Sequence, residues 1–183
     1  MRVLVHAGKI TGLDVSNSRL ESIPESIGLL VHLECLYARN NQLTELPESI
    51  GKLTLVEELV INHNRLTRLP ASIGNMANLY DLYAFDNQLT ELPDSIGSCS
   101  RLEKLYAYNN LLVTLPESIG NLKKLVTMEL SNNRLLKLPD SLRLLKSLHF
   151  LDLRLNPAVT TKMRKDALRE IVGLLCCHVQ PNV

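Results

Sequence analysis

The sequence predicts an α/β fold: a curved solenoid of short repeats, with a parallel sheet on its concave face and 3₁₀ or irregular turns on its convex face. Three observations support this prediction. A 23-residue unit recurs through most of the chain without insertion or deletion. In each unit, leucines alternate with polar residues over a short stretch, which is the pattern of a strand with one buried face. The 183 residues include no Trp, 5 Tyr and 2 Phe, so we expect an aliphatic core.

The repeats also define the domain organisation. Residues 10–157 hold seven copies of the unit, the last of which breaks off after Pro157. Residues 1–9 are predicted to form an N-terminal edge or cap segment, and residues 158–183 a C-terminal capping helix and tail. Both ends need such segments because a solenoid otherwise exposes its core at its first and last repeats.

The unit is clearest in its second, fourth and fifth copies. Residues 33–51 read LECLYARNNQLTELPESIG, residues 79–97 read LYDLYAFDNQLTELPDSIG, and residues 102–120 read LEKLYAYNNLLVTLPESIG. This motif resembles the leucine-rich repeat family, in the intracellular 23-residue class of Ras-associated scaffold proteins, their plant relatives and some bacterial proteins. The resemblance implies a scaffold that binds proteins and is not an enzyme. The partner it implies is a small GTPase, a phosphatase or another signalling protein.

Composition excludes several other classes of protein. Hydrophobic residues make up 45% of the chain and charged residues 21%, which indicates a folded protein. A net charge of +1 argues against nucleic-acid binding through a broad basic surface. No apolar stretch approaches the ~20 residues of a membrane span. The four cysteines lack the spacing of a disulfide framework, so we expect a reducing compartment and a cytoplasmic location.

The segment LPxSIGxL, which follows each predicted strand, is expected to pack behind the sheet. It is too short for a full α-helix, so we expect 3₁₀ or irregular turns there. Its Pro starts a compact turn, and its Gly permits either a positive φ or a close approach between backbones. In the sixth copy Arg143 replaces the Gly, and we expect that turn to become more helical.

One Asn in each unit is predicted to have a structural role. A turn that follows a buried strand leaves backbone N–H and C=O groups without partners, and an Asn amide can satisfy both kinds. Ser18 occupies this position in the first repeat, where we expect a weaker ladder. The ladder residues are Asn41, Asn64, Asn87, Asn110, Asn133 and Asn156.

The two ends of the chain have distinct patterns. Residues 2–6 are expected to form an edge strand that covers the first repeat. Beyond Thr160 or Thr161, a plausible N-cap, apolar residues recur at helical spacing as far as Leu175 and predict the capping helix. A basic helix that lies on a membrane surface is the alternative for this segment.

No catalytic constellation, metal site or cofactor motif is found in the sequence. It has neither a glycine-rich phosphate loop nor a nucleophile elbow, and its five histidines are dispersed. Cys176, Cys177 and His178 suggest a metal, but adjacent cysteines do not have the usual zinc spacing. We therefore expect a protein that is not an enzyme and binds no cofactor.

The concave face is the predicted binding surface. Six of the seven aromatic residues fall at positions that point to it, and four of them form a block on two adjacent strands. Exposed rings surrounded by charges are typical of a protein-binding hot spot. The alternative is that the rings stabilise the strands by cross-strand packing. The candidate partner-binding residues are Tyr37, Arg39, Tyr83, Phe85, Asp86, Tyr106, Tyr108, Glu129 and Arg154.

These observations favour a monomeric module that binds a protein partner on its concave face, with no nucleic acid and no membrane involved. Three other interpretations stay open at this point. The chain could be a secreted bacterial protein that acts on a host protein, a structural protein that assembles with itself, or an enzyme.

Overall fold

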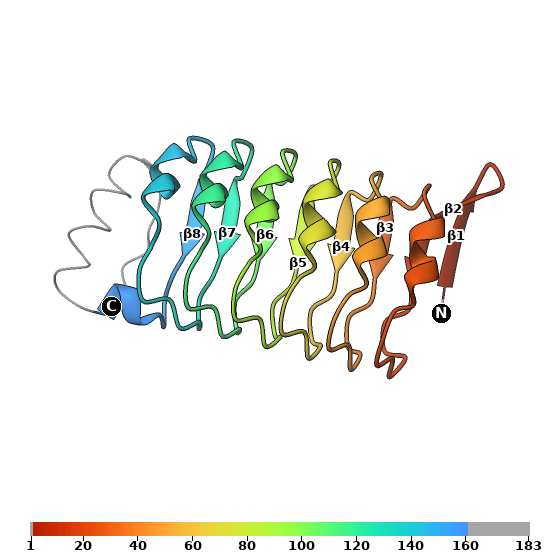
Figure 1. Ribbon diagram of the computed structural model, residues 1–183, viewed down its shortest axis with the longest axis horizontal. Helices are drawn as coiled ribbons and strands as arrows, with labels where there is room; N and C mark the ends of the chain where they lie inside the picture. Colours follow the sequence, from red (N-terminus) through yellow and green to blue (C-terminus); the bar gives the residue numbers. More distant parts are fainter. Residues whose placement is uncertain (1, 161–183) are drawn as a thin grey trace.

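A single open sheet of eight strands runs the length of the molecule (Figure 1). The structure is a computed structural model, and it describes residues 2–160. The strands follow one another in the sheet in chain order. They are β1 (Arg2–His6), β2 (Lys9–Asp14), β3 (Cys35–Tyr37), β4 (Glu58–Val60), β5 (Asp81–Tyr83), β6 (Lys104–Tyr106), β7 (Thr127–Glu129) and β8 (Phe150–Asp152).

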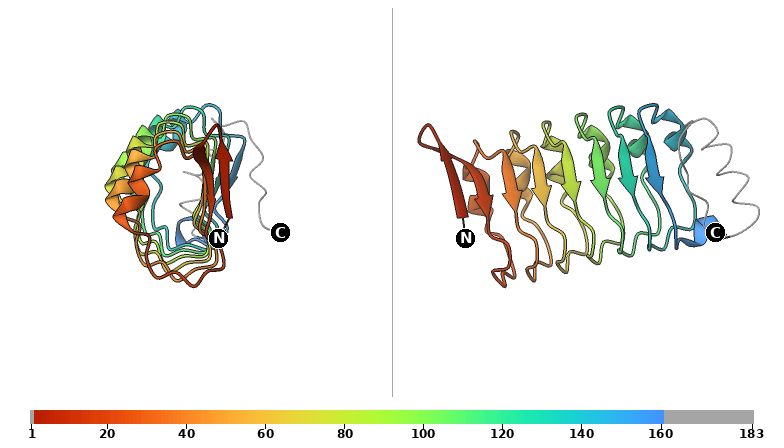
Figure 2. Two further views of the ribbon diagram at one scale, coloured as in Figure 1. Left: turned by 90° about the vertical axis from the view of Figure 1, so that its right-hand side faces the viewer. Right: turned by 180° about the vertical axis from the view of Figure 1, so that it is seen from behind.

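A second layer lies behind the sheet. The end-on view of Figure 2 shows the repeats in line, with the strands on one side and the short helices on the other. We call the outward face of the sheet the concave face and the opposite side the convex face. The 3₁₀ helices of the convex side are η1 (Glu25–Leu29), η2 (Glu48–Lys52), η3 (Ala71–Asn75), η4 (Asp94–Ser98), η5 (Glu117–Asn121) and η6 (Asp140–Leu144). The predicted solenoid with 3₁₀ turns is confirmed.

The register of the sheet aligns equivalent residues of all seven repeats. From β2 to β8 the strands are parallel, and each residue pairs with the residue 23 positions later, as Leu36 does with Leu59. Side chains at the same position of the unit therefore form continuous rows across the sheet. A row that faces outward places residues from neighbouring repeats about 4.8 Å apart.

Strand β1 occupies the N-terminal edge and pairs with β2 in the antiparallel direction. Ala7 and Gly8 connect the two strands, and both have positive φ angles, of 48° and 75°. Two central residues with positive φ are typical of the tight turns that suit the twist of a hairpin. Leu4 packs over Gly12 on the concave side, where a Cβ on Gly12 would lie 2.7 Å from its Cδ1 atom.

The core between the two layers is aliphatic. Within the described residues, the buried hydrophobic side chains are mainly Leu and Ile, and none is aromatic. The aromatic residues are thus left for other positions, which is the first structural indication that the concave face has a separate role.

The Asn residues bind the repeats to one another from inside. The Asn64 Oδ1 atom accepts the N–H of Leu43 at 3.1 Å, in the preceding repeat. Its Nδ2 atom donates to the carbonyl of Ala38, also in the preceding repeat, and to that of Ile61 in its own repeat. The same pattern recurs at Asn87, Asn110, Asn133 and Asn156. In the first repeat the Ser18 hydroxyl bonds only the carbonyl of Ser16.

The convex glycines allow neighbouring 3₁₀ helices to approach closely. None has a positive φ; instead, a Cβ added to Gly74 would lie 2.5 Å from the carbonyl oxygen of Ser95 in the next repeat. Arg143 takes the glycine position in η6, and no later 3₁₀ helix packs against it within residues 2–160. Because η6 has the same length of five residues as the other turns, the expectation of a more helical turn is wrong.

At the C-terminal end, helix α1 (Pro157–Thr160) follows the last strand. The Ala158 N–H donates to the carbonyl of Leu135 at 2.7 Å, which joins α1 to the sixth repeat. Helix α1 already contains Thr160, so the chain becomes helical earlier than the predicted N-cap, and Pro157 suits the first turn of a helix. The rest of the predicted capping helix, with Cys176, Cys177 and His178, lies outside the described residues.

Candidate functional site

Two aromatic stacks cross from β5 to β6 on the concave face. The rings of Tyr83 and Tyr106 stack with their centroids 4.9 Å apart, and those of Phe85 and Tyr108 stack at 4.4 Å, each pair nearly parallel. His63 adds an edge-on contact to Phe85 at 5.3 Å. The four stacked rings are half-buried, because each covers one face of its neighbour. Cross-strand packing, the alternative role of these rings, is therefore present, and it leaves the outward edges of the stacks accessible.

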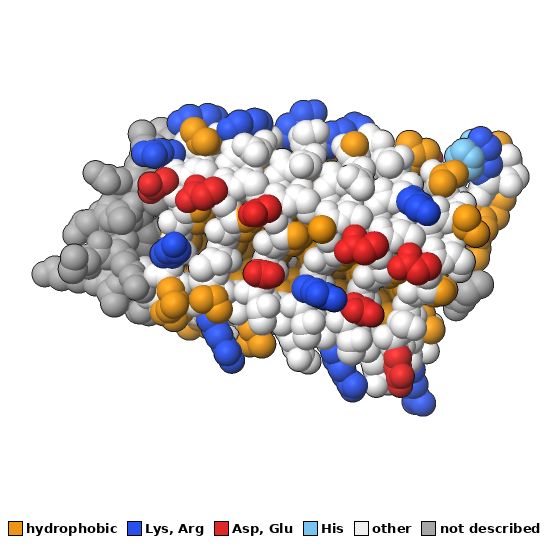
Figure 3. Space-filling view, in the orientation of Figure 1, with side chains coloured by type: hydrophobic (Ala, Val, Ile, Leu, Met, Phe, Trp, Pro, Cys, Tyr) orange, Lys and Arg blue, Asp and Glu red, His pale blue; other side chains and the backbone are white. Residues whose placement is uncertain are grey.

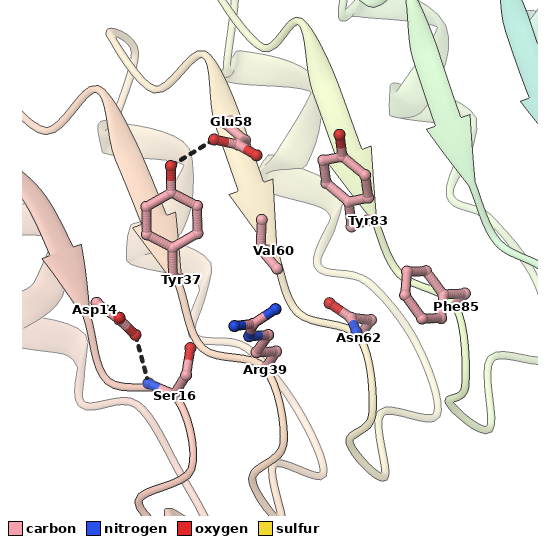
Figure 4. Close-up of a pocket in the computed structure, with 9 residues that line it drawn as sticks. All are labelled: Asp14, Ser16, Tyr37, Arg39, Glu58, Val60, Asn62, Tyr83 and Phe85. Carbon is pink, nitrogen blue, oxygen red and sulfur yellow. Dashed lines mark hydrogen bonds between the residues drawn. The ribbon is translucent and has the colours of Figure 1, made fainter. Parts of the chain in front are cut away.

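A hollow of about 460 Å³ opens beside these stacks, toward the N-terminus (Figure 4). Val60 forms its floor, because it is the small residue in a row that reads Tyr37, Val60, Tyr83 across β3, β4 and β5. The lining residues are Asp14, Ser16, Tyr37, Arg39, Glu58, Val60, Asn62, Tyr83 and Phe85.

The hollow brings together four of the predicted binding residues, Tyr37, Arg39, Tyr83 and Phe85. Tyr106 and Tyr108 stack behind two of them on the next strand. The prediction missed the residues of the floor and of the polar ends: Asp14, Ser16, Glu58, Val60 and Asn62. The available signal was a Val on β4 at the position where β3, β5 and β6 each have a Tyr.

Glu58 and Tyr37 form the wall at one end of the hollow. The Tyr37 hydroxyl donates to the Glu58 Oε2 atom at 2.5 Å, and the two side chains point toward each other in Figure 4. This hydrogen bond to a carboxylate, together with burial, raises the pKa of Tyr37 well above its usual value. Tyr37 is therefore neutral at physiological pH, and its ring is held in one orientation.

Asp81 and Lys104 support the Tyr83 ring. The Lys104 Nζ atom lies 3.1 Å from the Asp81 Oδ2 atom, and the Tyr83 hydroxyl donates to the same oxygen at 3.3 Å. The bond to Asp81 raises the pKa of Lys104. Burial, with the charge of Asp81 adding to it, raises the pKa of Tyr83 to about 12. The charges next to the stacks are thus partly neutralised within the protein.

Asp86, another predicted binding residue, lies in the turn that follows β5. Its φ angle is 52°, and its carboxylate contacts His63 Nδ1 at 3.2 Å and accepts from Asn109 Nδ2 at 2.7 Å. Every residue at this position of the unit has a positive φ, a conformation that Asn, Asp and His tolerate better than most residues. The positive φ of this turn is therefore enough to explain an Asp at position 86, and no binding partner is needed to explain it. The positive-φ row is Asn17, Asn40, His63, Asp86, Asn109, Asn132 and Leu155.

Glu129 and Arg154 are not brought into the hollow. Arg154 follows β8 and donates from its Nε and Nη2 atoms to the Asp152 carboxylate, at 2.9 and 2.7 Å. Burial by itself would raise the pKa of Asp152, but the hydrogen bonds from Arg154 outweigh it and lower that pKa. Burial and the nearby charge of Asp152 raise the pKa of Glu129. These residues form a separate charged cluster at the C-terminal end of the face.

The convex face has a row of acidic side chains, which Figure 3 shows crossing the 3₁₀ helices. Several of these carboxylates bond the backbone of the next repeat. Glu48, for example, accepts the N–H of Ser72 at 3.0 Å, and the hydrogen bonds from Ser72 lower the pKa of Glu48. The carboxylates of Glu25 and Glu117 likewise accept the N–H groups of Ser49 and Ser141. The row is Glu25, Glu48, Asp94, Glu117 and Asp140. Its contacts give at least three of its members a structural role.

Metal binding and membrane insertion are two further properties that bear on function. Residues 2–160 contain no group of three or more His, Cys, Asp or Glu residues arranged to hold a metal ion. The same residues form no helix with the length and apolar character needed to cross a bilayer.

Comparison with known families identifies the repeats. A family model described as a leucine-rich repeat region matches residues 17–112, and a second one, described as a leucine-rich repeat, matches residues 124–145. No curated protein matches the sequence significantly.

Solved structures with the same fold come from bacteria and plants. YopM from Yersinia enterocolitica is 39% identical, with a TM-score of 0.67 over 79% of this chain and 29% of its own. The leucine-rich repeat domain of the type III effector XopL is 28% identical, with a TM-score of 0.74 over 79% of this chain and 52% of its own. The ectodomain of the Arabidopsis thaliana receptor kinase GASSHO1/SCHENGEN3, solved with Casparian strip integrity factor 2, is 31% identical, with a TM-score of 0.70 over 80% of this chain and 18% of its own. The chain thus spans about half or less of the length of these structures.

Proposed function

The chain belongs to the leucine-rich repeat family, and we propose that it is a non-enzymatic scaffold that binds a protein partner on its concave face. Protein–protein interaction is the common role of this fold. The observation that carries the proposal is the pair of aromatic stacks beside the ring-lined hollow, in a protein whose buried core uses no aromatic residue within residues 2–160. Large rings placed on a face, and not in the core, favour recognition over packing volume.

The mechanism of binding is pre-organisation. Each ring of the stacks is held by its neighbour, and Tyr37 and Tyr83 are also held by hydrogen bonds to Glu58 and Asp81. A partner that docks on these rings does not need to order them, so less entropy is lost on association.

The class of partner and the location follow from resemblance and remain proposals. We propose a cytoplasmic signalling role, with a small GTPase, a phosphatase or another signalling protein as the partner. A bacterial protein delivered to a host cell is the second candidate, and the similarity to YopM and to the type III effector XopL supports it. Self-assembly through the concave face is the third.

The test is an affinity capture from native cell lysate with the double variant Tyr83→Ala/Tyr106→Ala beside the wild type, read by mass spectrometry. We expect at least one protein to be lost with the variant. Tyr80→Ala is the matched control, because Tyr80 precedes β5, is exposed and belongs to neither stack, although its ring contacts the Lys104 ammonium. Thermal unfolding of each variant shows whether its bait is folded.

An identical catch from the wild type and from a folded double variant would move the binding site away from the aromatic stacks. Light scattering over a range of concentrations separates a monomeric binder from an assembling protein. A mass that grows with concentration, and that the double variant abolishes, would support self-assembly over a foreign partner.

A further inference from the structure

The hollow on the concave face has the shape of an aromatic stack from which one ring is missing. Along the outward row of β3 to β6, the side chains are Tyr37, Val60, Tyr83 and Tyr106. Where Tyr is followed by Tyr, the rings stack at 4.9 Å. At Val60 the row is interrupted, and the Tyr37 and Tyr83 rings stand on either side of a short side chain (Figure 4). Two strand spacings of about 4.8 Å separate these rings, which leaves room for one planar group between them.

The charge at one end of this slot lacks a counter-ion. Glu58 lies on the same strand as Val60, and the only hydrogen bond to its carboxylate within residues 2–160 comes from the neutral Tyr37 hydroxyl. No ion pair involves Glu58 in the described part of the chain. By contrast, Asp81 is paired with Lys104, and Asp152 with Arg154.

The hollow is lined by two carboxylates, those of Asp14 and Glu58, and by one cation, that of Arg39, so these charges sum to −1. Arg39 lies at the end of the hollow opposite Glu58, beside Asn62 (Figure 4). The charge at the end of the slot away from Arg39 is therefore that of Glu58 (Figure 4).

The outward rows of the concave face also carry a net negative charge. The outward rows of the seven repeats contain six acidic residues against three basic ones, a net charge of −3 in a chain of net charge +1. Without the rim residues Arg19, Arg65 and Arg134, the outward rows are thus acidic, and their charge favours a basic group over an acidic one. The six acidic residues are Asp14, Glu58, Asp81, Asp86, Glu129 and Asp152.

We propose that this slot receives an arginine side chain of the protein partner, with its guanidinium between the rings of Tyr37 and Tyr83 and facing Glu58. The inference rests on the proposed function and adds the chemistry of the partner. A guanidinium is planar, stacks on aromatic faces, and donates in a fork that matches a carboxylate. The methylenes of the arginine lie over Val60. An ammonium fits this slot less well, because it is compact and strongly hydrated.

Asn62 completes the slot at its other end. The residue is 5% exposed. It lies next to Val60 on the same outward face, so it is within reach of the main chain of an arginine whose guanidinium is at Glu58 (Figure 4). Because Asn62 lines the hollow, its amide is placed to hydrogen-bond a group that enters there. In the proposed complex, Asn62 bonds a peptide group of the partner and Glu58 bonds the side chain.

The direct test uses the capped tripeptide Ac-Gly-Arg-Gly-NH2 as the probe and the methyl signals of Val60 as the readout, in ¹³C-methyl-labelled protein. We expect a saturable shift of the Val60 methyls in the millimolar range. Ac-Gly-Lys-Gly-NH2 and Ac-Gly-Gln-Gly-NH2 should bind more weakly, in that order. Equal affinity for the three peptides, or no shift of the Val60 methyls with the arginine peptide, would overturn the proposal.

Two variants make the assignment specific. Glu58→Gln keeps an acceptor for the Tyr37 hydroxyl and removes the charge, so it should weaken the arginine peptide at least ~3-fold. Val60→Tyr fills the slot with the residue type found at the same position of β3, β5 and β6, and should abolish binding. Glu57→Gln is the matched control, because Glu57 is the exposed neighbour of Glu58 in the chain. An affinity for Glu58→Gln equal to that of wild type would refute the role of this carboxylate.

The same variants separate this inference from the proposed function. If the lysate capture loses a protein with Tyr83→Ala/Tyr106→Ala and also with Val60→Tyr and Glu58→Gln, the slot is part of the interface. If the double alanine variant loses the protein but a folded Val60→Tyr variant and Glu58→Gln both retain it, the concave face binds a partner and the arginine slot is wrong. Should Val60→Tyr fail to fold, Glu58→Gln alone decides between these outcomes.

Discussion

The Asn ladder and the outward aromatic row are both columns of side chains that run from repeat to repeat, but only the first repeats its chemistry. Six successive repeats carry an Asn, and each Asn joins its own turn to the backbone of the repeat before it. The outward row on β2 to β8 changes at almost every step, from Asp14 through Tyr37 and Val60 to Glu129. The Asn ladder is thus a constant column of side chains, and the outward row is a variable column on the same repeating backbone.

The difference follows from what each column is required to do. A stacked turn leaves the same backbone groups without partners in every repeat, so one side chain solves the problem each time. No backbone group depends on the outward row, because its side chains project away from the core. The constant column therefore holds the solenoid together, and the variable column is free to define a surface.

The largest expected effect comes from breaking the constant interior. Leu105→Ala on β6 should lower the free energy of unfolding by ~2–5 kcal/mol, because Leu105 is fully buried and the truncation leaves a cavity. Tyr106→Ala, one residue later on the opposite face, should cost only about 1 kcal/mol, since the ring is half-buried and loses one stack. Urea unfolding of both variants measures the two values. A larger loss for Tyr106→Ala would show that the outward rings, and not the core, hold the strands.

The next effect isolates the ladder itself. Asn110→Ala should cost ~1–3 kcal/mol, because it leaves the N–H of Leu89 and the carbonyls of Ala84 and Ala107 without this partner. Asn109→Gly is the control in the adjacent residue. It removes side-chain hydrogen bonds to Asp86 and from Asn132, but no backbone group loses its partner and glycine suits a φ of 53°, so the loss should stay below about 1 kcal/mol. Similar losses for both variants, in the same urea titration, would contradict the distinction between the two columns.

The convex glycines offer a comparison within one column. Gly74→Ala should destabilise by ~1–3 kcal/mol, because its Cβ meets the backbone of Ser95 and the repeat spacing must open. Arg143→Ala, at the same position of η6, should be nearly neutral, since Arg143 is exposed and its position has already lost the glycine. Differential scanning calorimetry of the two variants checks the contrast. A neutral Gly74→Ala would mean that the 3₁₀ helices can move apart at little cost.

The smallest effect concerns the variable face and its response to alkaline pH. All five tyrosines have raised pKa values, through a hydrogen bond to a carboxylate at Tyr37 and Tyr80 and through burial at the others. A tyrosine whose pKa is higher in the folded state stabilises the protein fully below the unfolded pKa near 10. That contribution is lost as the pH rises through the folded value, which is about 12 for Tyr83.

Absorbance of tyrosinate at about 295 nm measures this titration directly. The folded protein should ionise well above pH 10, and the unfolded protein in guanidinium near pH 10. Tyr83→Phe should remove one of the late-ionising groups and leave the others in place. Coincident titrations of the folded and the unfolded protein would show that the rings are solvated and that the stacks do not form.

The fold could be predicted from the sequence in considerable detail. A constant 23-residue period with leucines at fixed positions has few physical solutions, because each unit can bury its apolar face only against an equivalent unit. The 3₁₀ turns followed from the length of the LPxSIGxL segment. The sequence did not decide whether the glycine of this segment serves a positive φ or a close approach between backbones. Close approach depends on the position of Ser95 and its equivalents, which lie one repeat away.

The candidate site was predictable only in part. The periodicity placed Tyr83, Phe85, Tyr106 and Tyr108 on one face, and register then made them neighbours. The sequence did not indicate that Asp86 is held in a turn, or that Arg154 is engaged by Asp152, because both facts depend on side-chain geometry. The row Tyr37, Val60, Tyr83 can be read from the period, but whether its rings leave a hollow over Val60 depends on side-chain orientation, which the sequence did not give.

What the sequence determined by itself is everything that repeats: the number of units, their register, the aliphatic core and the face on which each residue lies. These properties depend on period, and period can be read along the chain. What only the tertiary structure decided is everything that depends on differences between adjacent repeats, such as the slot over Val60 and the carboxylate of Glu58 that has no cation beside it within residues 2–160. Such features arise where side chains that are 23 residues apart come into contact, and the distances and orientations of those contacts are set in space.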